Sequence, residues 1–148
     1  MAIFVINEWL WHDSSGTNGR PLQLQSYEVI TRLGASDHQI VIIEGSAFDK
    51  KAWNICKSQD PVVAGIARAY IISLRQNSDR CRILHPQTVA DLPIALAAAT
   101  KADDHYLLHA LVTVEGAILV TTDMPLHQAV EGASLSCLSR EEFWNTYF

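Results

Sequence analysis

The sequence has little that would place the protein in a membrane or in an oxidising compartment. No run of apolar residues reaches the ~18 to 20 residues that a membrane-spanning helix needs. The first residues, Met1 to Ile6, lack the basic start and the small-residue cleavage site of a signal peptide. Only three of the 148 residues are cysteines. Their odd number and wide spacing predict reduced thiols rather than a disulfide framework or a zinc site. We therefore expect a cytoplasmic protein with no membrane association.

The chain is also poor in charge, with 18% charged residues against 49% in the hydrophobic set. That apolar content excludes an intrinsically disordered chain. A length of 148 residues corresponds to about one domain, which can bury roughly 70% of its unfolded surface. We therefore expect a single domain, 1–148, with a substantial core. The formal net charge of −5 argues against nucleic acid as a partner unless the charge is unevenly distributed.

Short apolar runs alternate with segments of helical periodicity. Strands that are apolar throughout are typical of a parallel sheet that is buried on both faces. Their alternation with helices predicts an α/β fold, a three-layer α/β/α sandwich with a mainly parallel central sheet. The expected strands are 3–6, 39–43, 82–84 and 117–120. The expected helices are 22–33 with Gly34 as its cap, 48–57, 61–75, 90–99, 103–114 and a C-terminal helix opened by a capping box at 139–142, and a turn-rich loop is expected over 11–19.

Polar and acidic side chains stand where these elements begin or end. In parallel sheets, functional residues gather at the carboxyl ends of the strands, near the point where the strand order reverses. We therefore expect the side chains at these positions to lie at one edge of the sheet. They are Asn7 and Glu8 after the first strand, Glu44 after the second, Thr121, Thr122 and Asp123 after the fourth, and Asp103 and Asp104 at the start of a helix.

Several carboxylates at one place repel one another unless a cation holds them. Mg²⁺ or Mn²⁺ would suit such a site because hard cations prefer oxygen ligands. A pair of these ions can activate water and stabilise the leaving oxygen of a phosphodiester. A simpler interpretation gives each acid a local role: Asp103 caps a helix, Asp123 caps a turn with Thr122, and Glu44 is a solvated loop residue. The residues alone leave both interpretations open.

Two segments in the second half of the chain resemble a known family. Residues 103–111, DDHYLLHAL, and 116–123, GAILVTTD, are similar to the C-terminal half of a PIN domain. PIN domains are small metal-dependent ribonucleases that occur in many toxin-antitoxin pairs. The first strand with Asn7 and Glu8 resembles the family's opening motif, an apolar strand followed by an acid. The resemblance implies an α/β/α sandwich, Mg²⁺ or Mn²⁺ held by three or four acids, and endonucleolytic hydrolysis of single-stranded RNA by activated water.

The resemblance also implies roles for the residues at the expected sheet edge. It implies catalytic roles for Asp103, Asp123, Glu44 and Glu8, metal contacts from Asp103, Asp104, Asp123 and Asn7, and an orienting role for Thr121 and Thr122. Asn7 stands where the family pattern has its first Asp, so that a neutral carbonyl replaces a charged ligand. The alternative function is therefore a catalytically lapsed PIN-like module that binds RNA or a protein partner.

Two choices remain open within this pattern. The second acid is assigned to Glu44, with Asp49 behind it, although the helix that should present this acid carries lysines. Spacing alone does not separate Asp103 from Asp104. The Asp103 register places residues 110–111 on the family's apolar positions, which favours Asp103.

Charge is unevenly distributed along the chain. Residues 48–82 hold seven basic and three acidic side chains, a net charge of +4, while the other residues hold four basic and thirteen acidic ones, a net charge of −9. A basic segment beside an acidic metal site would suit RNA, because Lys and Arg bind phosphates. An ordinary solvated helix face is the other interpretation. The candidate RNA-binding residues are Lys50, Lys51, Arg68 and Arg75.

Three further expectations concern partners and a rival metal. The family resemblance implies a homodimer, for which Trp53, Trp144 and Tyr147 are candidate contacts, and an antitoxin-type protein partner. His105 and His109 are four residues apart on one predicted helix, a spacing that can bind zinc. A zinc hydrolase is therefore a third hypothesis, although no third ligand is apparent.

Overall fold

The computed structural model describes all 148 residues, and a five-stranded sheet in which every pairing is parallel lies at its centre. The strands are β1 (Ile3–Ile6), β2 (Gln39–Ile43), β3 (Cys81–Leu84), β4 (Ile118–Val120) and β5 (Ser136–Leu138), in the order β3-β2-β1-β4-β5. The chain builds outward from β1 to β3 and then returns to the other side of β1 with β4. The strand order therefore reverses between β1 and β4, which is where sheets of this kind bind ligands.

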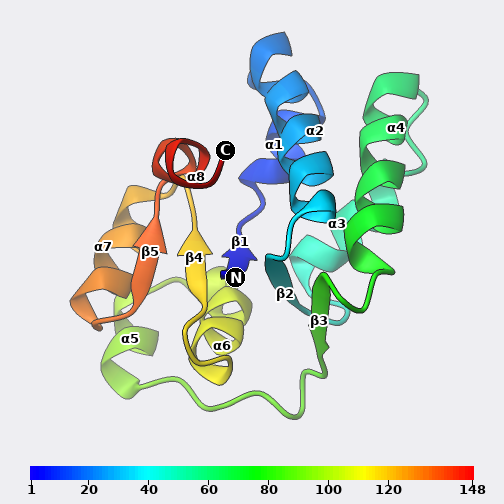
Figure 1. Ribbon diagram of the computed structural model, residues 1–148. Coiled ribbons are helices and arrows are strands. Elements are labelled where there is room, and N and C mark those ends of the chain that lie inside the picture. Colours follow the sequence, from blue (N-terminus) through cyan, green and yellow to red (C-terminus); the bar gives the residue numbers. More distant parts are fainter.

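Helices cover both faces of the sheet, which confirms the expected three-layer α/β/α fold (Figure 1). One layer contains α1 (Trp9–Ser14), α2 (Arg20–Ala35), α3 (Ala47–Ile55), α4 (Pro61–Tyr70) with its π-helical extension η1 (Ile71–Arg75), and α8 (Arg140–Tyr147). The other contains α5 (Ile94–Ala99), the 3-10 turn η2 (Ala102–Asp104), α6 (His105–Thr113) and α7 (Met124–Gly132). None of these helices combines the length and the apolar character needed to cross a membrane.

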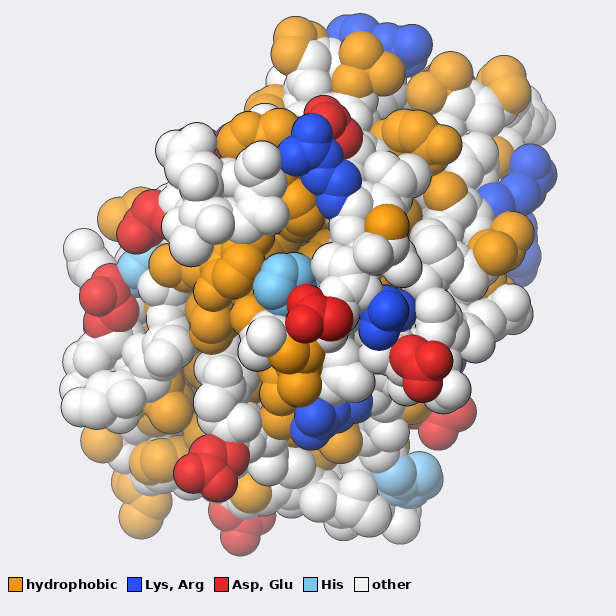
Figure 2. All heavy atoms as spheres, in the orientation of Figure 1, with side chains coloured by type: hydrophobic (Ala, Val, Ile, Leu, Met, Phe, Trp, Pro, Cys, Tyr) orange, Lys and Arg blue, Asp and Glu red, His pale blue; other side chains and the backbone are white.

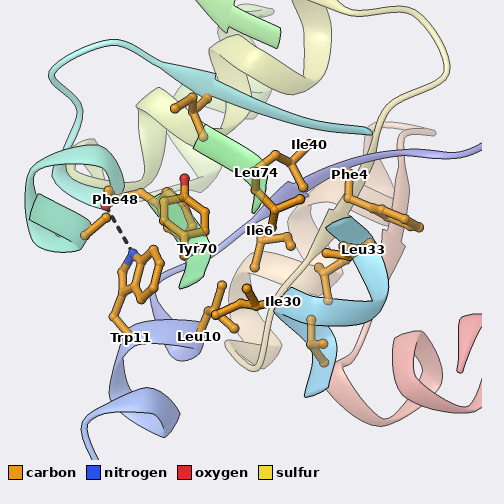
Figure 3. Close-up of a cluster of buried hydrophobic side chains, with 14 of the residues drawn as sticks. Phe4, Ile6, Leu10, Trp11, Ile30, Leu33, Ile40, Phe48, Tyr70 and Leu74 are labelled. Atoms are coloured by element: carbon orange, nitrogen blue, oxygen red, sulfur yellow. Dashed lines mark hydrogen bonds between the residues drawn. The ribbon is translucent and has the colours of Figure 1, made fainter. Parts of the chain in front are cut away.

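The central strands feed two separate cores because successive side chains of a strand point to opposite faces. Phe4 and Ile6 of β1 pack with α1, α2 and α4, whereas the residue between them packs with α6 and α7. In the first core (Figure 3), the indole Nε1 of Trp11 donates a hydrogen bond to the Phe48 carbonyl oxygen over 3.1 Å. The Trp11 ring meets Tyr70 edge-on, with centroids 4.7 Å apart. These contacts fix α1, and therefore the turn between β1 and α1.

Part of the expected loop over 11–19 is helical. Residues 11–14 belong to α1, and the sequence prediction was wrong there because Asp13 and Ser14 look like turn residues. Both are buried. Asp13 accepts two hydrogen bonds from Arg140 Nη1, at 3.0 and 2.9 Å, and the Ser14 hydroxyl donates to the Leu10 carbonyl at 2.6 Å. The decisive partner lies 127 residues away, where local periodicity gives no sign of it.

Gly34 lies inside α2 rather than capping it. A Cβ at this position would lie 2.8 Å from the Cβ of Ser73, so glycine allows α2 and η1 to approach closely. The helix ends instead at Ala35, where Ser36 takes up an extended conformation.

The chain also forms two elements that the sequence pattern did not predict, α7 and β5. The start of α7 carries a recognisable signal, because Asp123 accepts a hydrogen bond from the Leu126 amide and Pro125 stands in the first turn. Strand β5 has only three residues and pairs with β4 alone, as an edge strand. The capping box at Ser139 and Glu142, in contrast, is confirmed in both directions.

Candidate functional site

The ends of β1 and β4 are joined side by side at the point where the strand order reverses. The Asn7 amide donates to the Val120 carbonyl at 3.1 Å, and the Asn7 side-chain Nδ2 donates to the Thr121 hydroxyl at 3.0 Å. The Trp9 indole also donates to the Val120 carbonyl, at 2.9 Å. This network brings the residues that follow the first and fourth strands together, as the sequence predicts.

A cavity of about 400 Å³, called here the switch-point cavity, opens at this place. Eight of its nine lining residues are polar or charged, and the ninth is a tryptophan. The nine residues come from four segments of the chain. The lining residues are Asn7, Glu8, Trp9, His12, Thr17, Asn18, Asp104, Thr122 and Asp123. Three of these are carboxylates, and none is a lysine or arginine. The cavity therefore has the acidic character that the sequence predicts for this edge of the sheet.

Thr121 is hydrogen-bonded to two of the residues that line the cavity, Asn7 and Asp123. Its side chain is buried, and its hydroxyl oxygen accepts hydrogen bonds from Asn7 Nδ2 at 3.0 Å and from the Asp123 amide at 3.1 Å. Asp123 in turn accepts from the Leu126 amide through Oδ1, at 3.2 Å, as the N-cap of α7. One hydroxyl therefore links the two strand ends, whereas the neighbouring Thr122 is exposed and lines the cavity directly.

Asp104 carries the clearest electrostatic signature of the site. Partial burial raises its pKa, and the negative charges of Asp123, Asp103 and Glu8 raise it further, while the charge of Lys101 acts in the opposite direction. The direction of the shift means that the ionised form of Asp104 is disfavoured at this place. A carboxylate that binds a cation would show a raised pKa without the cation, because the positive charge is what would lower the pKa.

Asp104 and Asp103 are placed differently. Asp104 is half-buried and lines the cavity, whereas Asp103 is exposed and does not line it. The geometry therefore favours Asp104 as the acid that faces Asp123, in contrast to the register preferred from the sequence. The reason is the 3-10 turn η2, which tightens the chain just before α6 and leaves Asp104 in the N-cap position of α6.

Tyr106 lies close to two of these carboxylates, those of Glu8 and Asp104. Burial, followed by the charges of Glu8 and Asp104, raises the pKa of its phenol. Its hydroxyl is buried without a hydrogen-bond partner. No sequence pattern selects Tyr106, because it stands at one more apolar position of an amphipathic helix.

Glu44 and Asp49 lie outside the switch-point cavity. Glu44 is exposed after β2, and it does not line the cavity or act on Asp104. Asp49 is almost fully buried and paired with Arg75, with Nε to Oδ1 at 2.8 Å and Nη2 to Oδ2 at 3.2 Å. Asp49 also accepts from the Gly45 amide at 3.0 Å. The residues after β2 therefore supply no acid to the cavity.

The basic segment does not form one continuous surface. Arg75 is committed to its pair with Asp49 and is removed from the candidate RNA-binding residues. Lys50 and Arg68 are exposed on different helices, and Lys51 is half-buried. On the face shown in Figure 2, lysine and arginine side chains lie in separate groups, some of them beside carboxylates.

His105 and His109 each lie within hydrogen-bond distance of a backbone carbonyl oxygen. His105 Nε2 lies 3.2 Å from the Ala97 carbonyl oxygen, and His109 Nδ1 lies 2.8 Å from that of Ala90. Both rings thus tie α6 to the segment that contains α5. No third ligand is near, which removes the main support for the zinc hypothesis.

The switch-point cavity nevertheless fits a hard divalent cation. No group of three or more His, Cys, Asp or Glu side chains is close enough to enclose a metal. Mg²⁺, however, keeps several waters and is typically bound through only one or two carboxylates. Asp104 and Asp123 supply two such carboxylates, since both line the cavity and no lysine or arginine lines it.

Residues that the sequence did not select complete the cavity wall. Thr17 and Asn18 stand between Gly16 and Gly19, whose φ angles of 81° and 98° shape the turn. Asn18 Nδ2 donates to the buried Asp13 carboxylate at 2.7 Å. The two glycines and Asn18 are visible in the sequence as turn residues, but only the fold places that turn beside the acids.

A scan of the sequence against known protein-family models found no match, and a comparison with curated proteins found none either.

Proposed function

We propose that the protein is a PIN-like, Mg²⁺- or Mn²⁺-dependent endoribonuclease that cleaves single-stranded RNA in the switch-point cavity. The observation that carries the proposal is the group of three carboxylates, from Asp104, Asp123 and Glu8, that line one cavity at the point where the strand order reverses. No lysine or arginine side chain lines the cavity to offset them. The resemblance of residues 103–123 to a PIN domain supports the same assignment.

Asp104 and Asp123 are the residues that would hold the cation, and Thr121 positions Asp123 through its amide. A bound Mg²⁺ or Mn²⁺ would supply an activated water and stabilise the leaving oxygen of the phosphodiester. Asn7 contributes a neutral amide that donates to Thr121, and its Oδ1 accepts from the Glu8 amide at 2.7 Å. Asn7 therefore acts by holding the strand ends in place. Glu8 is the acid that remains to receive a proton from water.

The cavity volume favours a single strand over a duplex. About 400 Å³ lies within the range of small-ligand sites, which is enough for about one nucleotide. The neutral polar residues His12, Thr17 and Asn18 along one wall can contact a sugar or a base.

The test is cleavage of a set of single-stranded RNAs with Mn²⁺ or Mg²⁺. We expect the wild-type protein to cleave them and the Asp123→Asn and Asp104→Asn variants to lose at least about 10²-fold in rate, because each removes a charged ligand. The matched control is Asp103→Asn, which neutralises the exposed neighbour and is expected to keep activity. Absence of cleavage by the wild-type protein with either metal would exclude the proposal.

The second candidate is a lapsed PIN-like module that binds RNA or an antitoxin-type protein. Asn7 in place of an acid and the position of Glu44 outside the cavity favour it. A protein partner could use the apolar hollow between α2 and α4, lined by Leu24, Tyr27, Pro61, Val62, Gly65 and Ile66. A homodimer remains part of the family-based proposal, and Trp53 is its most exposed aromatic candidate. RNA or protein binding that needs no divalent cation, together with no cleavage, would favour this candidate.

A further inference from the structure

A second cavity borders the same acids, between the end of α5 and the start of α7. It has a volume of about 300 Å³, and we call it the α5-α7 cavity. It shares Asp104 and Asp123 with the switch-point cavity, so these two carboxylates form the boundary between the two spaces. Its lining residues are Ala98, Ala99, Thr100, Lys101, Asp104, Asp123, Pro125 and Leu126.

The two cavities differ in charge. Lys101 is the only lysine or arginine that lines either of them. Its side chain is exposed, and none of the ion pairs of the protein involves it. The first turn of α7 also lines the α5-α7 cavity, and its N-terminus is already capped by the Asp123 carboxylate. The α5-α7 cavity is therefore the less negative of the two, with one lysine beside the two shared acids, whereas the switch-point cavity has three acids and no lysine or arginine.

The α5-α7 cavity also offers apolar surface beside its cation. Ala98, Ala99 and Pro125 are exposed and line it. A nucleotide has both characters, a phosphate and a sugar-base part with apolar faces. The volume again corresponds to a small ligand of about one nucleotide.

We propose that the α5-α7 cavity binds the nucleotide next to the scissile phosphate, and that the Lys101 ammonium binds a backbone phosphate of that nucleotide. The strand would then cross Asp104 and Asp123, with a cationic subsite on one side and the neutral polar wall of Thr17 and Asn18 on the other. The proposal rests on the proposed nuclease function for the identity of the strand, and it adds a phosphate-binding residue.

A solvated lysine that only offsets the charge of Asp104 is the competing explanation for Lys101. The affinity for a nucleotide distinguishes the two explanations. If Lys101 acts on Asp104 alone, replacing it leaves the affinity for a nucleotide unchanged. If Lys101 binds phosphate, the affinity falls, and arginine at the same position restores it because the charge is kept.

The experiment is a titration with a 5′-phosphorylated diuridylate in Ca²⁺ buffer, followed by amide chemical shifts. We expect shifts at residues 98–101 and 126, and about tenfold weaker binding by Lys101→Gln, because a charge-assisted hydrogen bond to phosphate is lost. Lys101→Arg should bind like the wild-type protein, and so should Lys57→Gln, which removes an exposed lysine of the other layer. Equal affinity of Lys101→Gln and wild type, or shifts confined to other helices, would overturn the proposal.

Cleavage assays keep the two proposals apart. In an active protein, Lys101→Gln should raise KM for oligonucleotides with little change in kcat, since Lys101 binds the strand rather than the reacting atoms. Binding that depends on Lys101 in a protein that never cleaves RNA would exclude the nuclease function and retain the subsite. Cleavage with a KM that does not depend on Lys101 would exclude the subsite and retain the nuclease function.

Discussion

Two groups of acidic side chains in this protein differ in whether an arginine pairs with them. Asp49, at the start of α3, is buried and bound by the Arg75 guanidinium through both of its oxygens. Asp104 and Asp123, at the reversal between β1 and β4, form no ion pair with an arginine or lysine, and burial together with the charge of Asp123 raises the pKa of Asp104. Asp13 follows the first pattern, because it is buried against Arg140.

The difference separates structural acids from candidate functional ones. A buried carboxylate is stable only if it is paired, and an internal arginine provides that pair within the fold. A group of partly exposed acids without such a partner keeps its charge available for a cation from solution. The comparison therefore points to the switch-point cavity and away from the residues after β2.

The largest expected effect comes from breaking the structural pair. Asp49→Ala leaves Arg75 almost buried without its partner, and we expect it to lower the free energy of unfolding by about 3–5 kcal/mol. Urea denaturation measures this. The control Glu44→Ala changes an exposed acid five residues earlier and should stay within about 0.5 kcal/mol of the wild type. A similar small effect of both variants would contradict the structural role of the pair.

A smaller effect is expected at the residue that joins the strand ends. Thr121→Val keeps the shape of the side chain but removes the hydroxyl that accepts from Asn7 and Asp123. We expect a loss of about 1–3 kcal/mol in unfolding free energy, because buried donors lose their acceptor. Thr122→Val, at an exposed position, is the control. Unchanged stability and unchanged RNA cleavage in Thr121→Val would exclude an orienting role for Thr121.

The smallest effect is the pH dependence of stability contributed by Asp104. Because its pKa in the folded protein is raised, the folded state holds the proton more tightly than the unfolded chain. Stability is therefore lost as the pH rises from the ordinary carboxyl pKa to the raised one, and it is regained on acidification. Asp104→Asn lacks this contribution, so the stability difference between variant and wild type should grow over that pH interval and level off above it. A difference independent of pH would contradict the raised pKa of Asp104.

The sequence was sufficient for the layers of the fold because its signals there are local. Apolar runs identified β1 to β4, and capping residues such as Asp60 and Ser139 marked helix starts that the structure confirms. Asp13 was misread because its partner, Arg140, is distant in sequence. Strand β5 was missed because three residues with a polar start give too little pattern.

The residues of the candidate site were predictable where their position depends only on the end of a strand. The strand-end rule placed Asn7, Glu8 and Asp123 correctly at one edge of the sheet, since it depends only on where strands end. It could not separate Asp104 from Asp103, which differ by one residue in a 3-10 turn. Nor could it show that Glu44 stays outside the cavity or that Lys101 lies beside it, because both depend on how α5 and α6 pack.

The central claim is that the unpaired acids of the switch-point cavity hold a divalent cation. The most direct measurement is calorimetric titration with Mn²⁺ of the wild-type protein and of the Asp104→Asn and Asp103→Asn variants. The account predicts one Mn²⁺-dependent transition that Asp103→Asn keeps and Asp104→Asn loses. Equal Mn²⁺ binding by all three proteins, or no binding by the wild type, would contradict it.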